Sequence, residues 1–140
     1  MRGFSNLRAG ATVFVSRRNP QFARSFKCAS AIGAQLRAAG FARSPHHADW
    51  PPSVFSWFDR SNGVRYHQNI GVLYRTDTPA VLLEAGVIVN RAEELALRDP
   101  ATQQRLAAAV AQGVQNCLTG FTAGGRYNSE RQRFLFGQPE

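Results

Sequence analysis

Residues 78–90 read Thr78-Pro-Ala-Val-Leu-Leu-Glu-Ala-Gly-Val-Ile-Val-Asn90, an apolar run that contains a single carboxylate, Glu84. The run lacks strict alternation of polar and apolar residues, which predicts a strand over 80–86 that is covered on both faces. A second apolar run over 71–75 precedes it across a turn-like stretch and predicts another such strand. Strands of this kind are typical of layered α/β domains, so we expect an open sheet flanked by helices.

The segment before these runs supplies two further elements and a long loop. Residues 11–16 are β-branched and aromatic and predict a strand. Apolar residues then recur at helical spacing over 21–39, and Gly40 follows as a stop signal. Residues 41–69 contain three prolines and no sustained period, which predicts a long ordered loop.

Helices are expected after the Glu84 segment. Asn90 has the features of an N-cap for a short helix that ends at Arg98, and a second helix follows and ends at Gly120. We therefore expect one domain over residues 1–120 and a loosely ordered tail over 121–140.

The composition argues against several classes of function. The chain has 17 Lys+Arg and 9 Asp+Glu, a formal net charge of +8, but its arginines are dispersed and do not form the stripe typical of nucleic-acid binding. No run approaches the ~18 apolar residues of a membrane span. The two cysteines, Cys28 and Cys117, are too few for a disulfide-rich scaffold, and we expect them to be small buried apolar residues.

Glu84 is the strongest candidate for chemistry. It stands near the carboxyl end of its predicted strand, where α/β proteins place their sites, and partial burial there suits a general base. Gly86 would let the backbone or a substrate approach closely. The structural alternative is a glutamate that pairs with a neighbouring arginine or caps a loop.

Several segments in order carry a resemblance to a known family. They are Gly10-Ala-Thr-Val-Phe-Val-Ser16 with Asn19-Pro20, the Cys28-Ala29 and Ile32-Gly33 pairs, Asn69-Ile-Gly-Val-Leu-Tyr-Arg75, Pro79-Ala-Val-Leu-Leu-Glu-Ala-Gly86 and Asn90-Arg-Ala-Glu-Glu94. Together they resemble the C-terminal part of a zinc-dependent N-acetylmuramoyl-L-alanine amidase, over roughly Gly3 to Leu118. This family cleaves the amide between muramic acid and the peptide stem of peptidoglycan.

The resemblance implies an open α/β fold in which two histidines and a glutamate hold zinc, while a further glutamate acts on the zinc-bound water. Glu84 matches that last position. The family's ligand motifs, a His-Gly-Gly and a later His-Ala-Asn or His-His-Asp, are absent from this sequence. We therefore expect an N-terminally truncated amidase-type domain that holds no zinc by itself. Both an active and an inactive isolated chain are consistent with the sequence.

Other residues of the long loop are candidates for substrate contact. His46 and His47 with Asp49 and His67 have the chemistry of zinc ligands, but adjacent histidines on an extended chain point in opposite directions. Contact of His46 or His47 with substrate is the better interpretation. Trp50 could stack on a sugar ring, with packing inside the loop as the alternative.

The resemblance also implies a partner and a compartment. Peptidoglycan would be the substrate, in the periplasm or cell envelope, although residues 1–10 lack the apolar core of a signal peptide. An incomplete sheet would expose an unpaired edge and favour self-association. The alternative function is a non-catalytic cell-wall-binding remnant, and a nucleic-acid binder is the least favoured.

Overall fold

Strand β1 (Thr12–Val15) lies inside a four-stranded mixed sheet with the order β2-β3-β1-β4. The structure is a computed structural model that describes residues 3–45 and 57–122. β1 pairs in parallel with β3 (Val64–Tyr66) and antiparallel with β4 (Leu82–Glu84). β2 (Trp57–Asp59) adds antiparallel to β3. The sheet thus confirms the expected α/β class.

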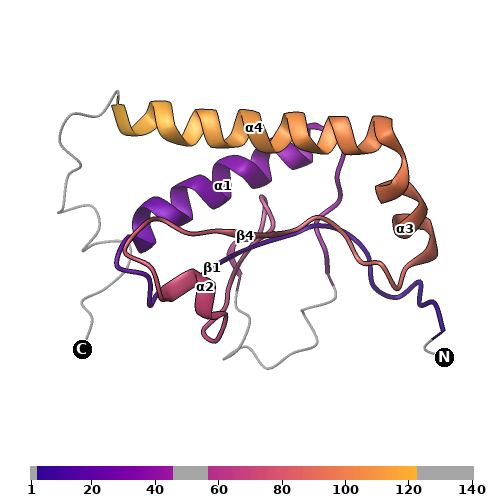
Figure 1. The fold of residues 1–140 in the computed structure, drawn as a ribbon, viewed down its shortest axis with the longest axis horizontal. Helices are drawn as coiled ribbons and strands as arrows, with labels where there is room; N and C mark the ends of the chain where they lie inside the picture. Colours follow the sequence, from indigo (N-terminus) through magenta and orange to yellow (C-terminus); the bar gives the residue numbers. More distant parts are fainter. Residues whose placement is uncertain (1–2, 46–56, 123–140) are drawn as a thin grey trace.

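Two long helices cover one face of this sheet in successive layers (Figure 1). Helix α1 (Phe22–Ala38) packs on β1, and α4 (Pro100–Thr122) runs along the outer side of α1. The core lies between the sheet and the two helices and is formed by Ala11, Val13, Val15, Ala29, Ile32, Leu36, Val64 and Ala109. The expected helices are therefore confirmed, although α4 continues to Thr122, past the predicted end.

Small residues allow α1 and α4 to approach closely. A Cβ atom added at Gly113 of α4 would lie 2.5 Å from the Cα atom of Ile32 in α1. A Cβ atom at Gly33, on α1, would lie 1.9 Å from the carbonyl oxygen of Asn62 in the β2–β3 turn. Because native packing leaves no room for extra atoms at such contacts, these glycines set the spacing of the layers.

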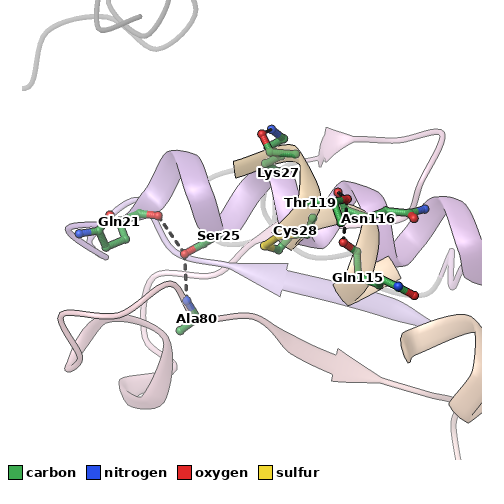
Figure 2. The surroundings of a disulfide bond; sticks show 10 residues. Gln21, Ser25, Lys27, Cys28, Ala80, Gln115, Asn116 and Thr119 are labelled. Carbon is green, nitrogen blue, oxygen red and sulfur yellow. Dashed lines mark hydrogen bonds between the residues drawn. A yellow bond between two sulfur atoms is a disulfide. The ribbon is translucent and has the colours of Figure 1, made fainter. Parts of the chain in front are cut away.

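The hydroxyl of Ser25 connects α1 with the segment that leads into β4 (Figure 2). It donates to the carbonyl oxygen of Gln21 at 3.1 Å and accepts from the backbone N–H of Ala80 at 3.0 Å. The side chain is completely buried, so both bonds are shielded from water. Ser25 therefore fixes the position at which β4 begins relative to α1.

The two cysteines form a disulfide, which corrects the expectation that they are separate apolar residues. Cys28 of α1 and Cys117 of α4 are bonded with a Cα–Cα distance of 4.9 Å, inside the range that disulfides require. Beside the bond, the Lys27 ammonium donates to the carbonyl oxygen of Gly120 at 2.9 Å. Spacing along the chain gave no signal for this bond, because 89 positions separate the partners and only the folded helices bring them together.

The run over 71–75 is not a strand. Its first four residues form the single-turn helix α2 (Gly71–Tyr74), with Leu73 fully buried and Val72 66% exposed. Four residues are too few to show a helical period, so an apolar run was indistinguishable from a strand. The predicted loop over 41–69 likewise contains β2 and β3, and its residues 46–56 lie outside the described residues.

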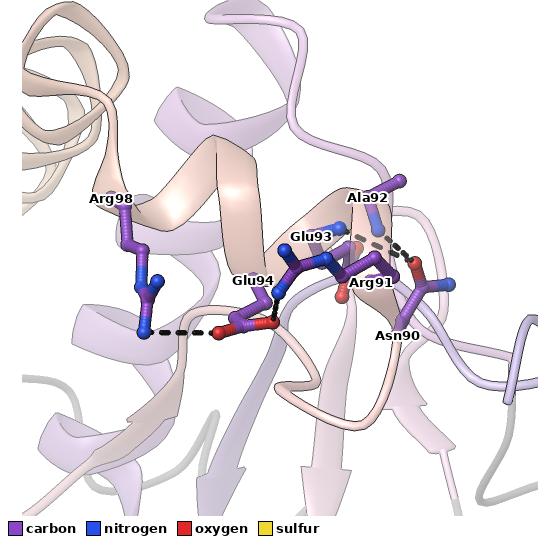
Figure 3. A network of polar contacts seen from close by, with 6 residues as sticks. All are labelled: Asn90, Arg91, Ala92, Glu93, Glu94 and Arg98. Carbon is purple, nitrogen blue, oxygen red and sulfur yellow. Dashed lines mark hydrogen bonds and ion pairs between the residues drawn. The ribbon is translucent and has the colours of Figure 1, made fainter. Parts of the chain in front are cut away.

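Helix α3 (Arg91–Arg98) begins at an anchored N-cap, as expected for Asn90 (Figure 3). The Oδ1 atom of Asn90 accepts from the backbone N–H of Ala92 at 3.0 Å and of Glu93 at 3.3 Å. Its Nδ2 atom donates to the carbonyl oxygen of Arg8 at 3.0 Å. One buried side chain therefore starts α3 and also binds the chain that leads into β1.

Removing the disulfide should lower stability. We expect Cys28→Ala/Cys117→Ala to lower the free energy of unfolding by about 2–4 kcal/mol, because a long loop in the unfolded chain loses its cross-link. Thermal melts with and without dithiothreitol measure this. The reductant should lower the wild-type melting temperature and leave that of the double variant unchanged; a wild-type melt insensitive to reductant would contradict the bond.

The two functions of Asn90 can be separated by substitution. Asn90→Ala should lower the free energy of unfolding by about 1–2 kcal/mol, because it removes the cap. Asn90→Ser keeps a cap acceptor and loses the donor to Arg8, so its loss should be smaller. Urea titration measures both, and an Asn90→Ala variant as stable as wild type would show that the cap is not needed.

Candidate functional site

The face of the sheet that points away from α1 and α4 carries polar residues. Successive side chains of a strand alternate between faces, so Thr12 and Phe14 lie opposite the core residues Val13 and Val15. Thr12 is paired with Glu84 and Phe14 with Arg65. Because directly paired residues project to the same face, these four side chains share one face of the sheet, on which Thr12, Phe14 and Arg65 are buried.

Glu84 is the last residue of β4, whereas the sequence predicted a strand that continues to Gly86 with Glu84 near its carboxyl end. The position of Glu84 in the sheet also differs from the expected one. β4 runs antiparallel to β1, so Glu84 lies beside Thr12 at the amino end of β1. It is therefore at the edge opposite the carboxyl ends of β1 and β3. Its side chain is half-buried, and the neighbouring Thr12 hydroxyl is buried with no hydrogen-bond partner among the described residues.

The Glu93 carboxylate fixes the backbone around Glu84. Its Oε2 atom accepts from the N–H of Val87 at 2.7 Å, three residues after Glu84. Its Oε1 atom accepts from the N–H of Gly10, two residues before β1, at 2.6 Å. Hydrogen bonds to an ionised acceptor are short and strong, so Glu93 holds the segment that follows β4 against the segment that precedes β1.

Two glycines make this arrangement possible. A Cβ atom at Gly86 would lie 3.2 Å from Oε2 of Glu93 and 3.1 Å from a methyl carbon of Leu97. Gly10 has a φ of +91°, and a Cβ atom there would lie 2.7 Å from the backbone of Arg43. The close approach expected at Gly86 is thus made by α3 of the same chain.

Arg65 places a cation on this face. It is 1% exposed, and its guanidinium carbon lies 3.6 Å from the centroid of the Trp57 ring. Burial, followed by the charges of Arg60 and Arg43, lowers the pKa of Arg65 to about 10. Arg65 therefore remains protonated at neutral pH and places a positive charge two strands from Glu84.

Among the residues that the structure describes, the other predicted site residues do not come together. His46, His47, Asp49 and Trp50 lie outside the described residues. His67 follows β3, where its Nδ1 atom accepts from the N–H of Asn69 at 3.1 Å. In residues 3–45 and 57–122, no three side chains of His, Cys, Asp or Glu gather to hold a metal ion, so these residues alone do not fit a zinc site.

Sequence reasoning identified Glu84 and missed the groups around it. Glu93 was visible only as the third residue after the Asn90 cap, and its bonds to Gly10 and Val87 depend on the fold. Arg65 has no local signal, because it is a polar residue in a three-residue strand.

A family model described as N-acetylmuramoyl-L-alanine amidase matches residues 3–116. Solved structures of similar fold include the N-acetylmuramyl-L-alanine amidase Ami1 of Mycobacterium smegmatis, with 21% identity and a TM-score of 0.67 over 84% of this chain. The apo form of Ami1 from Mycobacterium abscessus has 21% identity and a TM-score of 0.65 over 83% of this chain. The CwlD amidase of Clostridioides difficile, solved with the GerS lipoprotein, has 21% identity and a TM-score of 0.59 over 85%.

The chain spans about half the length of these structures, since it covers 50% of each Ami1 chain and 51% of the CwlD chain. A comparison with curated proteins finds no match. The structural likeness establishes the shared fold, and the family match extends over most of the chain. The chain therefore belongs to the N-acetylmuramoyl-L-alanine amidase family.

Proposed function

We propose that this chain acts in the hydrolysis of the amide between muramic acid and L-alanine in peptidoglycan, with Glu84 as the proton-transfer residue. The observation that carries the proposal is the position of Glu84, the single carboxylate of β4, at the strand end that Glu93 fixes against β1. Membership of the amidase family supports the reaction class.

The chemistry requires one group that can accept and return a proton. A water molecule attacks the amide carbon, and the Glu84 carboxylate takes the proton that this water loses. The carbon–nitrogen bond then breaks, and the same proton passes to the leaving amine of L-alanine. A half-buried carboxylate suits these proton transfers, because it remains accessible to substrate while its position is restricted.

A metal ion and further substrate contacts belong to the proposal as well. Amidases of this family generally depend on zinc, but the described residues do not form a zinc site. Contact of His46, His47 and Trp50 with the glycan or peptide remains a prediction, since all three lie outside the described residues.

We also propose that the chain functions in the periplasm or cell envelope. The disulfide between Cys28 and Cys117 supports this, because such bonds persist in oxidising compartments and are rare in a reducing cytosol. No helix in the described part of the chain has both the length and the apolar character to cross a membrane.

Substitution of Glu84 tests the role in catalysis. Purified chain is incubated with peptidoglycan in zinc-containing buffer, and new L-alanine amino termini are quantified. We expect Glu84→Gln to lower product formation by about 10² to 10⁴-fold, because the amide cannot accept a proton. Glu94→Gln is the matched control: Glu94 pairs with Arg91 and Arg98 on the surface of α3, and its loss should leave turnover unchanged.

The same assay distinguishes the second candidate function. The absence of a three-ligand metal group in the described residues favours a non-catalytic module that binds the cell wall. Wild-type chain that sediments with peptidoglycan and releases no product would support that module. Turnover by Glu84→Gln within a few-fold of wild type would instead show that Glu84 has a packing role.

A further inference from the structure

The carboxyl ends of β1 and β3 form an edge of the sheet that the proposed catalysis does not use. The two strands run parallel, so both end at the same edge, where α/β proteins commonly bind ligands. Arg18 follows β1 and Gln68 follows β3 there. Helix α2, which contains Tyr74, lies at the same edge because it is tied to the end of β1.

That tie is made by Asn19, which is 2% exposed. Its Nδ2 atom donates to the carbonyl oxygen of Leu73 at 2.8 Å and to that of Thr78 at 3.0 Å. The two acceptors are the buried residue of α2 and the first residue of the Glu84 segment. A shielded side chain therefore holds α2 in place on the strand end, so that the surface residues beside it have a defined position.

Two guanidinium groups flank the Tyr74 ring on this surface. The guanidinium carbon of Arg18 lies 3.7 Å from the ring centroid, and that of Arg75 lies 5.8 Å from it. Arg18 also donates from Nη1 to the carbonyl oxygen of Gln68 at 3.3 Å. These contacts orient the two cations and leave most of their donors available.

Neither cation is neutralised by an acid of the described chain. The ion pairs found within residues 3–45 and 57–122 join Glu94 to Arg91 and Arg98 on α3. Arg18 and Arg75 are both exposed and take part in none of them. Two oriented guanidinium groups around one aromatic ring thus form a compact positive surface that has no partner acid among the described residues.

We propose that Arg18, Tyr74 and Arg75 bind a carboxylate of the peptide part of the substrate. This inference rests on the proposed function, which supplies a peptide bearing free carboxylates. Guanidinium groups bind carboxylates through paired hydrogen bonds, and the Tyr74 ring offers an apolar surface for an adjacent side chain. A phosphate polymer fits less well, because it would need a longer stripe of cations than these two.

Binding to peptidoglycan, measured by sedimentation in EDTA, tests this without requiring turnover. We expect Arg18→Gln/Arg75→Gln to weaken binding by about tenfold. The matched control is Arg37→Gln/Arg105→Gln, which removes the same charge from exposed helix positions, where Arg105 stacks similarly on Phe41 at 5.0 Å. The control should bind nearly as well as wild type.

A second arm uses peptidoglycan whose carboxylates have been converted to amides with carbodiimide and glycinamide. Wild type should bind this material about tenfold more weakly, and Arg18→Gln/Arg75→Gln should cause little further loss. Two results would overturn the proposal in favour of a general charge effect. One is an equal loss of peptidoglycan binding in the two double variants, and the other is a loss in Arg18→Gln/Arg75→Gln that is as large on amidated as on untreated material. Duplex DNA carries phosphates and no carboxylates. If Arg18→Gln/Arg75→Gln lost as much binding to duplex DNA as to peptidoglycan, the proposal would also be overturned.

The binding test and the catalytic test can fail separately. The turnover assay changes Glu84, and the binding assay changes Arg18 and Arg75, which lie at the opposite edge of the sheet. Loss of turnover in Glu84→Gln with unchanged binding in Arg18→Gln/Arg75→Gln would overturn this inference alone. The reverse pattern would overturn the catalytic role alone.

Discussion

The paired hydrogen bonds of the Glu93 carboxylate are the constraint on which the candidate site depends. They join the N–H of Gly10, before β1, to the N–H of Val87, after β4. Without them, the segment after Glu84 would be held by the Asn90 cap and the short pairing of β4 with β1. A carboxylate that must transfer protons needs a fixed position, and Glu93 supplies it from a helix outside the sheet.

The layers behind the sheet give this arrangement its rigidity. Helix α1 contacts the strands on one side and α4 on the other, and Gly113 allows the helices to approach closely (Figure 1). The disulfide joins α1 to the carboxyl-terminal part of α4, whereas α3 connects the amino end of α4 to the Glu84 segment. The helix that carries Glu93 is therefore joined through Asp99 to the helix that the disulfide fixes to α1.

The sequence predicted the elements whose signals are local and missed those that depend on distant partners. The N-cap at Asn90, helix α1 and the carboxylate of β4 follow from composition and spacing. The run over 71–75 was misassigned because four residues show no helical period, and the side chain that ties α2 to the end of β1, Asn19, lies more than 50 positions away. The disulfide was missed for the same reason. Self-association through a sheet edge and the division at residue 120 stay predictions, because no observation tests them.

Amide hydrogen exchange at Gly10 and Val87 tests the role of Glu93 most directly. Glutamine at position 93 can accept through one oxygen only, so we expect at least one of the two amides to exchange about 10 to 100-fold faster in Glu93→Gln. Glu94→Gln should leave both rates unchanged, because its carboxylate binds arginines on the surface of α3 (Figure 3). Wild-type exchange at both amides in Glu93→Gln would show that Glu93 does not hold the strand ends together.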